Sequence, residues 1–211
     1  MTLRTAYERE VLGRILDSAM KETDALRREL LASVGGRVAE IGFGTGANLP
    51  AYGDAVEEIL AIEPSHGLLE RAAPAIARSG LRVTPIEASA SRPLPIEPAS
   101  CDAVVITFVL CSVKHVDALL EQATRLLRPG APLVVVEHVV ARGSFVRASQ
   151  KAIRPLWSAL LGGCDPAFDA RTAYERAGFD TAPLRDLELP FPFPVKTGLA
   201  GRIVRDPSKR S

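Results

Sequence analysis

Blocks of apolar and polar positions predict strands and helices in alternation along the chain. Continuous apolar runs predict strands at 37–41, 57–62, 81–86, 102–108 and 132–137. Helical spacing predicts helices at 66–78, 116–127, 148–161 and 170–177, and two late strands are expected at 184–189 and 199–204. Apolar strands alternating with helices are typical of a mostly parallel α/β sheet with helices on both faces. Ligands of such sheets bind beyond the carboxyl ends of the strands.

The first residues predict a further helix. Its apolar positions recur four apart, with two leucines beside them: Leu3, Tyr7, Val11, Ile15 and Ala19, then Leu12 and Leu16. This spacing predicts one amphipathic helix whose stripe packs on the core, and Gly35-Gly36 is expected to end the helical segment. We interpret residues 1–34 as a helical lid on a single domain spanning 1–211.

Composition narrows the function classes. The 211 residues carry a formal net charge of +1 and are 47% hydrophobic but only 5% aromatic. A balanced charge and few aromatic rings argue against nucleic-acid partners, and the length and apolar content predict a folded core. The longest apolar run, 103–113, is too short to span a membrane. With no signal-peptide pattern at the charged N-terminus, we expect a cytoplasmic protein with a small-molecule acceptor.

Cysteine and histidine spacing predicts neither disulfides nor a metal site. Cys101, Cys111 and Cys164 form no CxxC pair, and three scattered cysteines are a poor disulfide framework. The three histidines also lack the spacing typical of zinc ligands.

A glycine loop is the most informative segment. The first strand ends at Ile41 and continues into Gly42-Phe43-Gly44-Thr45-Gly46. As Gly-x-Gly-x-x-Ala it fits a loose dinucleotide fingerprint, and as Glu-x-Gly-x-Gly-x-Gly it fits an S-adenosylmethionine loop. Both ligands need an acid after the second strand for the ribose, and Glu63 fills that place; alternatively the glycines only pack and Glu63 caps a helix. Glu40, awkward in a dinucleotide pattern, favours S-adenosylmethionine.

From these residues onward the chain resembles a class I S-adenosylmethionine-dependent methyltransferase, in the group that holds the ubiquinone/menaquinone methyltransferases. The resemblance rests on Glu40-Ile-Gly-Phe-Gly-Thr-Gly46, Glu63-Pro64, Cys101-Asp102-Ala-Val-Val and Arg125-Leu-Leu-Arg-Pro-Gly130. Further segments are similar to the methyltransferase-like thiol methyltransferases and their bacterial relatives: Phe108-Val-Leu-Cys-Ser-Val113, Glu137-His138-Val139, Trp157, Gly162-Gly-Cys164 and Glu175-Arg-Ala-Gly-Phe179.

The resemblance implies a Rossmann-like sheet of seven strands, six parallel and the last antiparallel, with S-adenosylmethionine as cofactor. It implies cofactor contacts after the first four strands, at Glu40, Gly42, Phe43, Gly44, Asn48, Glu63, Pro64, Ser65, Glu87, Ala88, Ser89, Phe108 and Val109. Asn48 is equally compatible with capping the short turn that follows the loop.

Few residues suit acid–base or acceptor roles. His138 follows the fifth strand, and a histidine side chain titrates near neutral pH, so His138 is the candidate base. Alternatively, its ring only forms a hydrogen bond at the end of the sheet. For the substrate pocket we consider Tyr7, Cys111, Trp157 and Cys164, each of which is also compatible with a packing role.

The favoured function is methyl transfer to a small apolar acceptor, with a thiol preferred because its pKa of about 8.5 requires no strong base. O-, N- or C-methylation of a metabolite or lipid head group is the nearest alternative. An NAD(P)-dependent oxidoreductase and a non-catalytic module on the same fold remain open alternatives. The sequence does not fix the oligomeric state.

Overall fold

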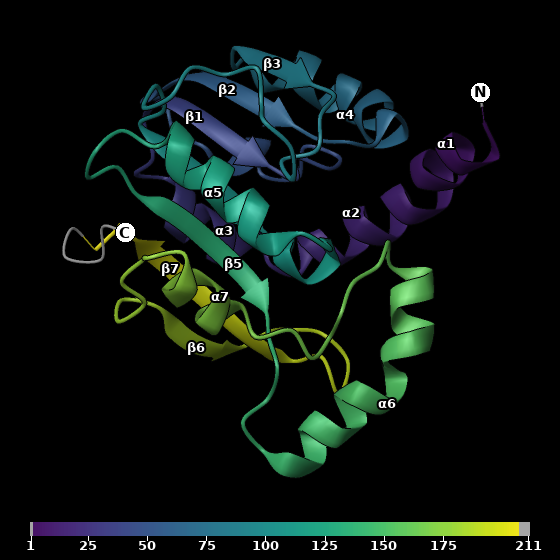
Figure 1. Cartoon of the computed structure of the whole chain (residues 1–211). Coiled ribbons are helices and arrows are strands. Elements are labelled where there is room, and N and C mark those ends of the chain that lie inside the picture. The colour runs from purple at the N-terminus through teal and green to yellow at the C-terminus, as the bar shows by residue number, and fades with distance from the viewer. Residues whose placement is uncertain (1, 207–211) are drawn as a thin grey trace.

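A single seven-stranded sheet forms the centre of the protein (Figure 1). The structure is a computed structural model that describes residues 2–206. The strands are β1 (Gly36–Ile41), β2 (Val56–Ile62), β3 (Val83–Ile86), β4 (Ala103–Thr107), β5 (Leu133–His138), β6 (Arg185–Glu188) and β7 (Thr197–Ile203). Their order across the sheet is β3-β2-β1-β4-β5-β7-β6.

Strand direction agrees with the Rossmann-like sheet that the resemblance implies. β3, β2, β1, β4 and β5 pair in parallel. β7 lies between β5 and β6 and is antiparallel to both, so β6 runs with the other five. The prediction of six parallel strands and one antiparallel strand is therefore confirmed.

Helices cover both faces of the sheet, as predicted. They are α3 (Asp24–Leu31) and α4 (His66–Ser79) on one face, and α5 (Val116–Leu126) and α7 (Ala170–Arg176) on the other. α6 (Ser144–Leu160) stands away from the sheet (Figure 1) and contributes no side chain to either core cluster. Successive strand residues point to opposite faces, so Val38 packs in the core with α3 and α4, whereas Ala39 packs in the core with α5 and α7. This double burial explains why the strands are continuous apolar runs.

The strand order indicates where ligands bind to the sheet. After β1 the chain builds outward through β2 and β3, then returns to place β4 on the other side of β1. The carboxyl ends of β1 and β4 thus border the switch point where ligands of open α/β sheets bind. The glycine loop follows β1 directly, and the turn η3 (Leu110–Ser112) follows β4 after two residues.

The N-terminal segment differs from the single helix predicted. It consists of α1 (Leu3–Tyr7), a π-helical stretch η1 (Glu8–Leu12) and α2 (Gly13–Lys21), and a turn at Thr23 separates α2 from α3. The predicted break at Gly35-Gly36 is thus the second one, at the start of β1. No glycine or proline marks the break at Thr23.

The prediction that the apolar positions recurring four apart pack on the core was also wrong. Leu3, Val11 and Ile15 are 93%, 48% and 40% exposed. The wider turn of η1 changes the helical phase, so a stripe drawn at constant spacing does not follow one face. Leu12 and Leu16 turn inward instead and line the cavity described below.

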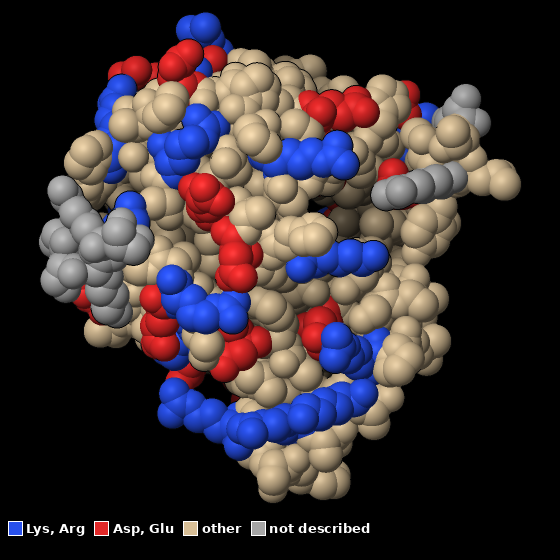
Figure 2. Space-filling view, viewed as in Figure 1, with Lys and Arg blue, Asp and Glu red and all other residues tan. Residues whose placement is uncertain are grey.

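Charge is distributed without a dominant sign on the face in view. Figure 2 shows basic and acidic side chains interspersed there, apart from a basic band along the lower edge. Of the helices within residues 2–206, none has the length and apolar character needed to cross a membrane.

Candidate active site

A cavity of about 520 Å³ opens at the switch point between β1 and β4. Its volume lies within the usual range for small-molecule sites. The ends of β1, β2 and β4 form its floor, and the N-terminal helices cover it. Twelve predicted cofactor residues line it: Glu40, Gly42, Phe43, Gly44, Asn48, Glu63, Pro64, Ser65, Ala88, Ser89, Phe108 and Val109. The fold thus brings together residues from four separate loops.

Two glycines of the loop have different physical roles. A Cβ on Gly42 would lie 2.3 Å from a methyl carbon of Val109, so Gly42 allows the loops after β1 and β4 to approach closely. Gly44 has a φ of +58°, and a Cβ there would meet its nearest protein atom only at 3.9 Å. Because Gly44 lines the cavity, that Cβ would project into ligand space.

Glu63 holds the glycine loop against the end of β2. Its two carboxylate oxygens accept hydrogen bonds from the backbone N–H groups of Gly44 (3.0 Å) and Ser65 (2.9 Å). Burial raises the pKa of the Glu63 carboxyl, against the opposing effect of these two N–H groups. The helix cap is Ser65, whose hydroxyl accepts from the N–H of Leu68. Two carboxylate oxygens offer about four acceptor sites, so Glu63 retains capacity for hydroxyl donors from a ligand.

Glu40 is buried within a hydrogen-bonded network at the cavity wall. Its oxygens accept from the Tyr52 hydroxyl at 2.6 Å and from the Asn48 amide at 3.0 Å. The same amide nitrogen donates to the Thr107 hydroxyl at the end of β4 (3.0 Å). Burial raises the pKa of Glu40 to about 7, although both hydrogen bonds favour the charged form. A cationic ligand group beside this carboxylate would remove the cost of its ionisation.

Arg27 is a site-shaping residue that sequence reasoning missed. It is almost fully buried in α3, donates to the Asn48 amide oxygen (3.0 Å) and contacts the Ala47 carbonyl. It also donates to the Met20 carbonyl at 2.9 Å and therefore joins α2 to the glycine loop. Its position with Leu30 and Leu31 on one face of a helix was the available signal, because an arginine on an apolar face needs buried acceptors.

The N-terminal helices are fixed over the cavity by contacts with α4. A Cβ on Gly67 would lie 2.5 Å from the Thr5 carbonyl oxygen, so this glycine allows the two segments to touch. Arg71 forms an ion pair with Asp17 at 2.6 Å. On the other side, the Tyr7 hydroxyl donates to the Leu160 carbonyl of α6 (3.1 Å). Tyr7 also lines the cavity, so the predicted covering helix borders the site.

Five predicted residues do not line this cavity. Glu87 is exposed, and its carboxylate lies 2.8 Å from His66 Nδ1. The other four are His138, Cys111, Trp157 and Cys164. The His138 ring is directed at Cys164 rather than at the cavity. The structure therefore gives the hypothesis of a His138 base no support.

Three of these residues, Cys111, His138 and Cys164, instead form a buried cluster of their own, with the half-buried Trp157 beside it. His138 Nε2 lies 2.7 Å from Cys164 Sγ, and the Trp157 indole N–H donates to the same sulfur at 3.4 Å. The donor atoms of Cys111, His138 and Cys164 all lie within 4.8 Å of one another. The Cys111 thiol, together with His138 and Trp157, lowers the pKa of Cys164 to about 5 against the effect of burial. Spacing along the chain did not indicate this grouping.

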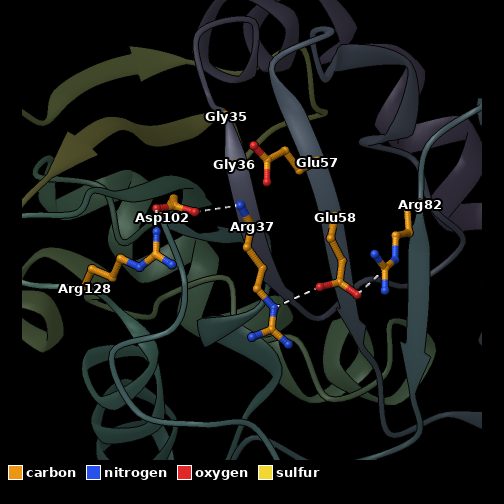
Figure 3. Close-up of a pocket in the computed structure, with 8 residues that line it drawn as sticks. All are labelled: Gly35, Gly36, Arg37, Glu57, Glu58, Arg82, Asp102 and Arg128. Atoms are coloured by element: carbon orange, nitrogen blue, oxygen red, sulfur yellow. Dashed lines mark hydrogen bonds and ion pairs between the residues drawn. The ribbon is translucent and has the colours of Figure 1, made fainter.

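A second cavity, of about 570 Å³, lies at the opposite edge of the sheet (Figure 3). Five of its six charged side chains form ion pairs between neighbouring strands or the loops that precede them: Arg37 with Glu58 at 2.9 Å, Arg82 with Glu58 at 3.6 Å, and Arg128 with Asp102. Surface pairs of this kind contribute at most about 1 kcal/mol each. They connect strands, and the edge is not the one where such sheets bind ligands.

The doubly wound sheet, the glycine loop and the two acids Glu40 and Glu63 at the cavity wall are features typical of the class I methyltransferases. The sequence matches the methyltransferase domain family over residues 39–135. The chain belongs to the S-adenosylmethionine-dependent methyltransferases, and S-adenosylmethionine is its methyl donor. The alternative of an NAD(P)-dependent oxidoreductase is thereby set aside.

Individual relatives differ in the acceptor that their names state. The human thiol S-methyltransferase TMT1A is 32% identical over 72% of this chain, which spans 63% of that relative's length. The phosphatidylethanolamine N-methyltransferase of Cereibacter sphaeroides is 31% identical over 74% of this chain and 78% of its own. An S-adenosylmethionine-dependent methyltransferase of Leishmania major has the same fold, with a TM-score of 0.66 at 15% identity over 95% of this chain and 81% of its own.

Proposed function

We propose that this enzyme transfers the methyl group of S-adenosylmethionine to a small, apolar thiol. The observation that carries the proposal is the lining of the cavity beside the turn that follows β4. Apolar side chains dominate there: Leu12, Phe108, Val109, Val113 and Leu161. Among the described lining residues, the ionisable side chains are Tyr7, Glu8, Glu40 and Glu63.

Cofactor placement follows from the two acids and the open glycine. We assign Glu63 to the ribose hydroxyls, because its oxygens keep acceptor capacity after binding two N–H groups. Glu40 is assigned to the methionine ammonium, and Gly44 to close contact with the methionine part of the cofactor. Pro64 and Ser65 flank the adenine in this arrangement, and Ala88 and Ser89 reach its edge. The cofactor supplies an activated methyl group on a sulfonium, so the protein mainly aligns the acceptor and excludes water.

A thiol suits this wall because it needs little help with deprotonation. Its pKa of about 8.5 leaves a useful thiolate fraction near neutral pH, whereas a phenol or carbon acid requires a positioned base. Both deep carboxylates, Glu40 and Glu63, are already engaged by the glycine loop and its network. The similarity to the human thiol S-methyltransferase supports the same acceptor class.

A lipid amine is the second candidate acceptor. It is favoured by the 31% identity to the phosphatidylethanolamine N-methyltransferase, of which this chain covers 78%. Its head group would carry an ammonium that must lose a proton before attack, so this acceptor requires a positioned base, unlike a thiol.

The test is turnover on three acceptors that differ in one atom: thiophenol, phenol and aniline. Methylated products are measured by mass spectrometry, and vesicles containing phosphatidylethanolamine provide a fourth arm. We expect methyl thioether with a kcat/KM at least about tenfold above the other acceptors, consistent with the higher thiolate fraction. Preferred methylation of aniline or of the lipid would contradict the thiol assignment. The Glu63→Ala enzyme serves as the control for product that does not depend on the site.

A further inference from the structure

The buried cluster of Cys111, His138 and Cys164 lies outside the cofactor cavity and has no part in the proposed transfer. We propose that these three side chains form a binding site for one thiophilic divalent metal ion, of which Zn²⁺ is the representative. Two thiolates and one imidazole are a known ligand set for zinc that leaves a fourth position for water or another small ligand. The proposal does not depend on the identity of the methyl acceptor.

The geometry requires only small movements. Zinc–sulfur and zinc–nitrogen distances of about 2.3 and 2.0 Å place tetrahedral ligand atoms about 3.6–3.8 Å apart. The three donor atoms already lie within 4.8 Å of one another. The closest pair, His138 Nε2 and Cys164 Sγ, is at 2.7 Å and would separate by roughly 0.9 Å to admit the ion.

Charge balance favours a divalent ion at this depth. All three side chains are buried, and two thiolates with a neutral imidazole carry a charge of −2. A divalent cation neutralises the group, which matters because an isolated buried charge is costly.

Neighbouring groups orient Cys164 and the turn that carries Cys111. The Trp157 indole N–H donates to Cys164 Sγ at 3.4 Å, a contact suited to orienting a metal-bound thiolate. Glu137 accepts hydrogen bonds from the N–H groups of Val109 (3.3 Å) and Leu110 (3.1 Å). Those bonds fix the turn that carries Cys111 against the strand that carries His138.

The three ligands come from three segments, two of which also border the cavity. Cys111 lies in η3, His138 at the end of β5, and Cys164 in the loop after α6. Their chain neighbours Ser112 and Gly162 line the cavity directly. A bound ion would therefore join the end of β5 to two segments that line the methyltransferase site.

Metal content of the purified full-length chain tests the proposal. The protein is prepared with a phosphine reductant, supplied with Zn²⁺ and dialysed against a weak chelator. Its zinc content is then measured by elemental mass spectrometry. We expect one zinc per chain in the wild type and in Cys101→Ser, and a loss of affinity above about 100-fold in Cys111→Ser and Cys164→Ser. Replacing outer-shell partners alone already costs about 10–100-fold. Cys101 is the matched control because it is buried but precedes β4, at the far end of the strand.

A spectroscopic measurement on the wild type removes any dependence on variant folding. Titration with Co²⁺ should give the intense visible bands of a tetrahedral ion and a sulfur-to-cobalt charge-transfer band, both removed by excess Zn²⁺. Only the weak bands of aqueous Co²⁺, together with zinc far below one per chain, would overturn the proposal. Equal zinc loss from Cys101→Ser would overturn it as well, because binding would then not depend on the cluster.

Discussion

Replacing Gly44 by alanine tests whether the glycine loop contacts the cofactor. Gly44 has a φ of +58°, and its added Cβ would meet no protein atom closer than 3.9 Å. The substitution therefore has two separable effects. Backbone strain lowers the free energy of unfolding, by about 1 kcal/mol once the lower entropy of the unfolded alanine chain is included. The new methyl group occupies cavity space that we assign to S-adenosylmethionine.

The steric effect should dominate affinity. Inserting a methyl group into a well-packed contact costs about 1–3 kcal/mol, which corresponds to about 5- to 150-fold weaker binding. Gly80→Ala is the matched control, because Gly80 ends α4 with a φ of +71° and a Cβ added there would have nothing within 4 Å. It should show the same loss of stability and no change in affinity.

Calorimetric titration with S-adenosylmethionine and urea unfolding measure the two effects separately. We expect both variants to unfold at lower urea concentration by similar amounts, and Gly44→Ala alone to bind the cofactor more weakly. If Gly44→Ala bound as tightly as the wild type while losing the same stability as Gly80→Ala, the cofactor would not pass over the loop as assigned.

Three further predictions concern the same site. Burial raises the pKa of Glu40 to about 7, so this carboxyl is protonated in the free protein at about pH 6. The same group ionises at about pH 4.5 in the unfolded chain, so the free energy of unfolding falls as pH rises from about 4.5 through 7. The cofactor ammonium favours the ionised carboxylate, so binding at about pH 6 should release a proton, which calorimetry in buffers of different ionisation enthalpy detects. Glu40→Gln should abolish this release, and equal release from the variant would contradict the pairing of Glu40 with the ammonium. Glu63→Gln keeps one acceptor for two backbone N–H groups, so urea unfolding should show a loss of about 1–3 kcal/mol, and an unchanged midpoint would refute the role in holding the loop. Gly67→Ala places a Cβ 2.5 Å from the Thr5 carbonyl, so limited proteolysis should cut the N-terminal helices faster than in Gly143→Ala, whose Cβ meets nothing within 4 Å; equal rates would show that α4 does not hold them.

The sheet and the cofactor loop could be predicted because their signals are local. β1 and β2 are apolar runs that end directly before Gly42 and Glu63, and parallel pairing places both ends at one sheet edge. The same reasoning could not locate the break at Thr23. An amphipathic pattern continues across it, and a π-helical phase change leaves no mark in residue type.

The remaining site depends on contacts between distant parts of the chain. Cys111, His138 and Cys164 are 27 and 26 residues apart, so their spacing resembles no compact ligand motif. Only the pairing of β4 with β5 and the return of the loop after α6 bring them together. Arg27 is similar, because its acceptors lie in the loop after β1 rather than in its own helix.

The position of β7 has a consequence for synthesis of the chain. β5 pairs along its whole length with β7, Leu133 opposite Ile203 and His138 opposite Gly198. Its partner on that side is thus translated roughly 60–70 residues later, which at about 5–20 residues per second leaves a delay of roughly 3–14 s. Throughout that interval an apolar strand presents unpaired N–H and carbonyl groups to other chains. The nascent chain is therefore most vulnerable to aggregation just before its last strand emerges, when ribosome-bound chaperones would protect it most.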